Sequence, residues 1–157
     1  GFTVAEDQLE VLGSFLMERL APYVATARQS ASLGIDGALT VEGATLELVE
    51  ELAQVGPFGS GNSEPRMVIT ASRIVNAKVV GRGHVRCILA GATGKRLTAI
   101  AFRAAGEELG HMLLSASEGP LHLAGNLRIN RWRERDDVQL IIQDAAQANA
   151  ANAGDGA

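Results

Sequence analysis

The spacing of hydrophobic residues changes once along this chain of 157 residues, close to Arg66. Before that point apolar side chains recur at steps of three and four, which predicts one helix from about Thr3 to Pro22 and another over residues 45–55. After it they alternate with polar side chains, as in half-buried strands. The sequence therefore predicts a helical part followed by a sheet. Five segments have strand character: residues 66–80, 84–90, 97–103, 121–130 and 138–144.

The order of these elements along the chain indicates which class of β fold the sheet forms. Residues 103–119 lie between the third and fourth strands and suit a short helix. Three strands, a helix and two further strands is the chain order of an OB-fold, a five-stranded Greek-key barrel. In the fourth strand Leu127 and Ile129 share one face, while Arg128 and Asn130 share the other. We predict a mainly β protein with some α-helix, in which a five-stranded OB barrel follows the helices.

The chain is expected to have four parts. These are a helical part over residues 1–56, a joint rich in Gly and Pro over residues 57–65, the barrel over residues 66–144 and a tail over residues 145–157. The tail consists of small and polar residues that bury little apolar surface, so we expect it to be flexible. No stretch approaches the roughly 18 apolar residues of a membrane helix. We therefore expect a soluble protein.

The first residues and the single cysteine indicate where such a chain belongs. It begins with Gly1, and its first ten residues lack the basic and then apolar pattern of a secretion signal, so we expect a piece of a longer protein. Cys87 is the only cysteine, which excludes a disulfide within the chain and favours a reducing cytoplasm. We expect Cys87 to be buried rather than reactive.

The formal net charge of -4 hides an uneven distribution. Residues 1–65 contain two basic and ten acidic side chains, whereas residues 66–143 contain twelve basic and six acidic ones. A basic block behind an acidic one is typical of a chain in which one module meets a polyanion and its neighbour does not. Chance segregation over two short windows remains the alternative.

The basic residues fall where OB-folds bind oligonucleotides: on strands two and three, and in the loops that join strands one to two and four to five. Trp132 continues the alternation of Arg128 and Asn130, and an exposed indole can stack on an unpaired base, worth about 1–3 kcal/mol. Two alternatives stay open, namely that Trp132 covers the barrel end as a lid and that the arginines are only solvated. The predicted DNA-binding residues are Arg82, His84, Arg86, Lys95, Arg96, Arg103, Arg128, Asn130, Arg131, Trp132, Arg133 and Arg135.

No combination of residues predicts catalysis by this chain. His84, His111 and His122 do not fall at metal-ligand spacing. The segment "GATGKR" lacks the upstream Gly and the following Ser or Thr of a phosphate-binding loop, and a hairpin turn explains it better. We therefore predict no catalytic residue and no metal site.

One segment, "LELVEELAQVGPFGSGNSEPRMVI" at residues 46–69, resembles a known family. It is similar to the part of the RecJ single-strand-specific DNA exonucleases that joins the DHHA1 domain to the OB domain. The start "GFTV", "AIAF" at residues 99–102 and "NRWRERDDVQLIIQD" at residues 130–144 resemble the same family. We interpret the matching residues as a rigid joint rather than a DNA contact; they are Pro57, Phe58, Gly59, Gly61, Asn62 and Pro65.

The resemblance implies a parent enzyme that degrades single-stranded DNA from 5′ to 3′ in recombination and repair. Its catalytic DHH domain, which would hold Mn2+ or Mg2+, and its Gly-Gly-His motif are absent from these residues. Residues 1–56 would then be a helical remnant of the DHHA1 domain, and the chain itself would bind single-stranded DNA without a cofactor or catalysis. The further expected partners are the DHH/DHHA1 core and a single-strand binding protein.

Two other functions remain alternatives. In one, the basic face is a protein-interaction module that receives an acidic peptide, such as the tail of a single-strand binding protein. In the other, the barrel is architectural and has negligible affinity for DNA in isolation.

Overall fold

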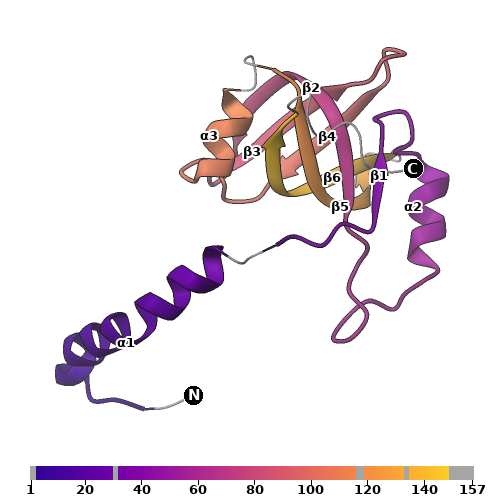
Figure 1. Ribbon diagram of the computed structural model, residues 1–157. Helices are drawn as coiled ribbons and strands as arrows, with labels where there is room; N and C mark the ends of the chain where they lie inside the picture. Colours follow the sequence, from indigo (N-terminus) through magenta and orange to yellow (C-terminus); the bar gives the residue numbers. More distant parts are fainter. Residues whose placement is uncertain (1–2, 30–31, 116–118, 133–134, 149–157) are drawn as a thin grey trace. The chain divides into compact units, whose positions relative to one another are not determined.

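The computed structural model describes residues 3–29, 32–115, 119–132 and 135–148. Two compact units divide the chain, one over Gly1–Gly34 and the other over Ile35–Ala157. Figure 1 shows the helix of the first unit and the strands of the second.

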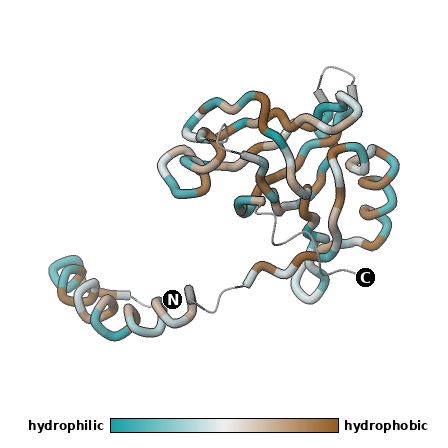
Figure 2. Tube along the Cα trace, turned by 45° about the horizontal axis from the view of Figure 1, so that its top comes forward, coloured by the Kyte–Doolittle hydropathy of each residue, from teal (hydrophilic) through white to brown (hydrophobic). Residues whose placement is uncertain are grey.

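The first unit consists of the short 3-10 helix η1 (Glu6–Gln8) and the long helix α1 (Leu9–Gln29). The prediction that the helix ends at Pro22 is wrong, because α1 continues through this residue. A proline removes one helical hydrogen bond, and the helix-forming residues after Pro22 maintain the others. Figure 2 shows hydrophobic residues along α1, and Phe15, Met17 and Tyr23 are exposed there.

The second unit is a barrel, which confirms the predicted mainly β fold of the OB type. Strands β2, β3 and β4 are antiparallel neighbours, β4 pairs with β6 in parallel, and β6 pairs with β5. The pairing of β5 with β2 closes the barrel (Figure 1). The elements are β1 (Gly37–Leu39), α2 (Leu46–Ala53), β2 (Met67–Val80), β3 (His84–Ala90), β4 (Arg96–Ala101), α3 (Glu108–Leu114), β5 (Leu121–Trp132) and β6 (Arg135–Gln147).

The last two strands are longer than predicted. Strand β5 continues to Trp132, and β6 begins at Arg135 and continues to Gln147. Residues 145–147 therefore belong to the sheet and not to the predicted tail, because they pair with the start of β5. The rest of the predicted tail, residues 149–157, lies outside the described residues.

The structure divides the chain after Gly34 and not near residue 56, where we expected the helical part to end. Strand β1 pairs with the first residues of β2, at an edge that β3 does not reach. Val49 of α2 is buried in the same core as the barrel strands. Strand β1 satisfies its backbone hydrogen bonds by pairing with β2, and α2 buries its apolar face against the barrel. Residues 35–56 therefore belong to the barrel and not to a separate helical part.

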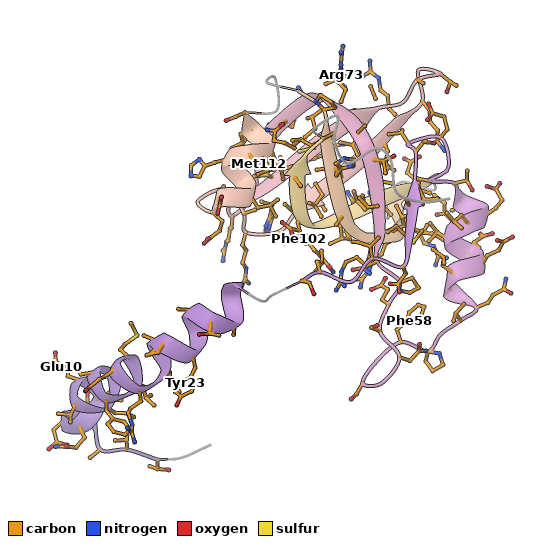
Figure 3. The ribbon with its side chains drawn as sticks, in the orientation of Figure 1. Glu10, Tyr23, Phe58, Arg73, Phe102 and Met112 are labelled. Carbon is orange, nitrogen blue, oxygen red and sulfur yellow. The ribbon has the colours of Figure 1, made fainter. Side chains whose placement is uncertain are left out.

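The segment between α2 and β2 is held at both ends. The Asn62 Nδ2 amide donates to the carbonyl oxygens of Val55 at 3.2 Å and Pro57 at 3.0 Å. At the other end, the buried Asn126 Nδ2 donates to the carbonyl oxygen of Pro65 at 2.8 Å. Figure 3 shows Phe58 within this segment. These contacts anchor the segment, and its role as a rigid joint stays a prediction.

The barrel interior is filled by one side of each strand. Val85, Cys87 and Leu89 alternate with more exposed residues on β3, and each of the three is fully buried. Gly125 lies where the register of β5 and β6 shifts, and a Cβ atom there would overlap the backbone oxygen of Ile141. Close packing of these two strands therefore requires glycine at residue 125.

We expect Gly125→Ala to lower the free energy of unfolding by about 1–3 kcal/mol, because backbone atoms must move to admit the methyl group. Urea denaturation measures this loss. Gly106→Ala is the matched control, since no atom lies within 4 Å of its added Cβ. Equal unfolding midpoints for the two variants would contradict the close approach.

Candidate nucleic-acid interface

Strand register defines which side chains share the outside of the barrel. Directly paired residues point to the same side of a sheet. Because Cys87 is buried, its neighbour Arg86 points outward, and so do its partners Lys78 on β2 and Ile100 on β4. The same reasoning along all five strands gives a set that we call the outer face: Arg73, Lys78, Arg86, Ile88, Arg96, Thr98, Ile100, Arg128, Asn130, Asp137 and Gln139.

The sequence patterns identified only part of the outer face. Arg86, Arg96, Arg128 and Asn130 were predicted. The register puts Arg86 and Arg96 on the neighbouring strands β3 and β4, and Arg128 and Asn130 on β5, with β6 between them and β4. Arg73 and Lys78 were missed. Simple alternation puts these two on opposite sides of β2, but the register shifts between Ile74 and Asn76 and aligns them. Figure 3 shows Arg73 pointing away from the barrel.

Lys95 was predicted to bind DNA, but its ammonium group is used within the fold. Its Nζ donates to the carbonyl oxygens of Glu42 at 3.1 Å and Ala44 at 2.9 Å. The same loop is held by a hydrogen bond from the Thr93 N–H to Glu42 Oε1 at 3.0 Å. That bond is the main reason why the pKa of Glu42 lies below its usual value. Lys95 therefore fastens the segment before α2 to the turn between β3 and β4.

Arg128 lies on the outer face, but its charge is paired. Its Nη2 lies 2.6 Å from Glu64 Oε2, and its Nε donates to Glu64 Oε1 at 3.1 Å. The hydrogen bond and the attraction of Glu64 both raise the pKa of Arg128. Arg131 has a looser contact, with its Nε 3.8 Å from Asp136 Oδ2. Both arginines thus contribute less free positive charge than the sequence suggests.

A second cluster lies at the end of β4. His84 Nδ1 accepts a hydrogen bond from the backbone N–H of Arg103 at 2.9 Å. The imidazole ring meets Phe102 edge to face, with 5.2 Å between ring centroids. Phe102 is 57% exposed and was not among the predicted site residues. The alternation of Leu97, Ala99 and Ala101 in the core points Phe102 outward, so the sequence contained a signal for it.

The remaining predicted residues are only partly described. Arg82, in the turn between β2 and β3, and the Arg103 side chain are exposed. Trp132 and Arg135 pair through their backbones at the end of the β5–β6 hairpin. The side chains of these two residues and the whole of Arg133 lie outside the described residues. Stacking by Trp132 therefore remains a prediction.

Surface cavities border this region. One of about 320 Å³ opens on the outer face and is lined by Arg86, Thr98, Asn130, Asp137, Val138 and Gln139. Another, of about 440 Å³, lies between α2, the joint and β5. Its lining is largely apolar and includes Leu52, Phe58 and Ile129, with Arg128 and Arg131 beside them.

In the part of the chain that the structure describes, no three His, Cys, Asp or Glu side chains lie close enough together to hold a metal ion. Burial raises the pKa of the Cys87 thiol to about 11, so the thiol is neutral near pH 7. Within the same described residues, no helix is both long and apolar enough to cross a membrane.

The fold and the outer face define an OB-type barrel with basic side chains on its outside. Residues 35–144 match the family described as RecJ OB domain, and the chain belongs to this family. It is 26% identical over 114 residues to the single-stranded-DNA-specific exonuclease RecJ of Bacillus subtilis (strain 168), over 71% of this chain and 14% of that protein. The resemblance that the sequence suggested is thereby confirmed.

Two crystal structures of RecJ from Thermus thermophilus also resemble this chain, one in complex with Mn2+ and one in complex with Mg2+. Both have a TM-score of 0.54 and 22% sequence identity. They cover 87% and 86% of this chain, but the matches span only 20% and 21% of those proteins. The chain thus corresponds to a small part of its relatives, and the likeness supports the fold.

We expect Lys95→Ala to lower the free energy of unfolding by about 1–3 kcal/mol, because two carbonyl oxygens lose their donor. Arg96→Ala removes the next basic side chain, which is exposed, and should change stability by less than about 0.5 kcal/mol. Chemical denaturation of both variants tests the assignment. Equal stability of the two would show that Lys95 does not fasten the loop.

Proposed function

We propose that the outer face binds single-stranded DNA. The observation that carries this proposal is the alignment of Arg73, Lys78, Arg86 and Arg96 on one side of an OB-type barrel. Guanidinium and ammonium groups bind phosphates through charge and hydrogen bonds, largely without regard to sequence. A single strand that crosses these side chains would release counterions, so its affinity should fall with salt.

The cluster at the end of β4 adds a place for bases. Phe102 exposes an apolar ring on which an unpaired base can stack. Because His84 Nδ1 accepts a hydrogen bond, the neutral imidazole carries its proton on Nε2, which can donate to a phosphate. Paired bases cannot reach such a ring, so this cluster favours single strands over duplex.

Membership of the RecJ OB domain family supports the proposal, and the Bacillus subtilis relative is named for its action on single-stranded DNA. We place hydrolysis by the parent enzyme, with its Mn2+ or Mg2+, in other segments of a longer RecJ chain, and we assign recombination and repair in the cytoplasm to that enzyme. In this proposal the present part holds the strand.

Replacing Arg86 and Arg96 by Ala should weaken binding of a short oligo(dT) at low salt. Each lost phosphate contact should also reduce the slope of log affinity against log salt by about 0.7. Fluorescence anisotropy measures both quantities. Arg19→Ala removes one positive charge from α1, as each of the two replacements does from the barrel; it is the control and should leave binding unchanged.

The hairpin arginines are tested in the same assay. If the β5–β6 hairpin contributes to the groove, replacing Arg131, Arg133 and Arg135 together by Ala lowers affinity further. Unchanged affinity in this variant would remove the hairpin from the binding surface but leave the outer face in place. Unchanged affinity in both sets of variants would refute the proposed function.

Phe102→Ala should weaken binding of single strands by roughly fivefold or more, the lower limit expected for one lost stacked base. Phe102→Trp should preserve binding, because an indole also offers a stacking surface. Duplex of the same length should bind equally to all three proteins. A Phe102→Ala variant that is folded and binds oligo(dT) as tightly as the unaltered chain would exclude stacking at this residue.

The cavity beside α2 favours a second candidate, in which the barrel receives an acidic peptide such as the tail of a single-strand binding protein. Its apolar lining could hold apolar side chains of the peptide, and Arg131, whose contact with Asp136 is loose, could pair with a carboxylate of the peptide. Competition separates the two candidates, since a peptide that binds in this cavity should not displace oligonucleotide from the outer face.

A further inference from the structure

The cavity on the outer face gathers polar side chains from four strands. Thr98 on β4 lies opposite Gln139 on β6, and Asp137 on β6 lies opposite Asn130 on β5. Together with Arg86 of β3 and the apolar Val138, they line a space of about 320 Å³. These residues stand on paired strands and not on a loop, so their backbones are held in fixed register.

The polar groups of this cavity have no protein partner in the part of the chain that the structure describes. No hydrogen bond or ion pair there engages the side chains of Thr98, Asn130 or Asp137. Asp137 contrasts with its neighbour Asp136, whose carboxylate faces Arg131. As far as the described residues go, the donors and acceptors of the cavity are available to a ligand.

The chemistry of the lining argues against a phosphate and for a base. Asp137 is an exposed carboxylate that accepts hydrogen bonds and repels phosphate. The amides of Asn130 and Gln139 can donate and accept, and the Thr98 hydroxyl can do both. Arg86 adds one cation at the cavity wall. This combination suits the edge of a heterocyclic base, while Arg86 can meet the adjoining phosphate.

We propose that this cavity is a subsite for one unpaired nucleobase, and that Asp137 makes it prefer bases with an exocyclic amino group over thymine. Cytosine offers its N4 amino group to a carboxylate, and adenine and guanine also carry amino donors. Thymine has no amino group, and two carbonyl oxygens flank its single N–H. The inference rests on the proposed function, because it assigns a specificity to the same surface.

The test compares oligo(dC) and oligo(dT) of equal length at pH 8 and one salt concentration, with the 157-residue chain. We expect oligo(dC) to bind at least about fivefold more tightly, the lower end of the range for one edge-specific contact. Asp137→Asn should abolish this preference. It should also strengthen binding of oligo(dT), because one negative charge is removed from the DNA-facing surface.

Glu50→Gln is the matched control, since it removes an exposed carboxylate from α2, away from the cavity lining. This variant should keep the preference for oligo(dC). Equal binding of the two oligonucleotides by the unaltered chain would overturn the subsite but leave the proposed function standing. A preference that persists in Asp137→Asn would also overturn the role of Asp137. Failure of both oligonucleotides to bind would instead refute the proposed function itself.

Discussion

Closure of the barrel depends on β2, which changes its partner part of the way along. Its first residues pair with β5, and from Arg73 onward it pairs with β3. The change coincides with a register shift between Ile69 and Ser72 and with a positive φ of 43° at Ala71. At this bend His122 Nδ1 accepts the Ala71 N–H at 3.4 Å. Without the bend one sheet could not have both a closed interior and a continuous outer face.

Once the barrel is closed, the alternation of side chains along each strand determines which charged residues point to the same side of the sheet. Arg86 and Arg96 come to lie on the same side of the neighbouring strands β3 and β4 because Cys87 and Leu97 must face the core. Two other cations of the basic block are already used by the fold, Lys95 by carbonyl oxygens and Arg128 by Glu64. The net charge of a sequence window therefore overstates the charge that a ligand meets. What matters for binding is the number of cations without a protein partner on one surface.

The sequence predicted the strands because one side of each strand must be apolar, and that requirement is visible in a single segment. It could not predict contacts between distant segments. The partners of Lys95 lie 51 and 53 residues away, and nothing local indicates them. The same limit explains why β1 and α2 were assigned to a separate helical part. The bulge that aligns Arg73 with Lys78 is likewise a property of strand pairing. Phe102 differs from these cases, because its outward direction follows from the alternation of its own strand.

A carboxylate at Asp137, which has no partner among the described residues, is unfavourable for a surface that only has to attract phosphates. It opposes the field of the surrounding arginines, and an exposed acid can be replaced with little effect on stability. The cost is local, since charges separated by more than about 8–10 Å are largely screened at physiological salt. A carboxylate at Asp137 slightly weakens the attraction of the outer face for DNA phosphates. In return it adds a hydrogen-bond acceptor to the proposed subsite for a base. That balance makes sense for a surface that distinguishes bases and little sense for one that grips only the backbone.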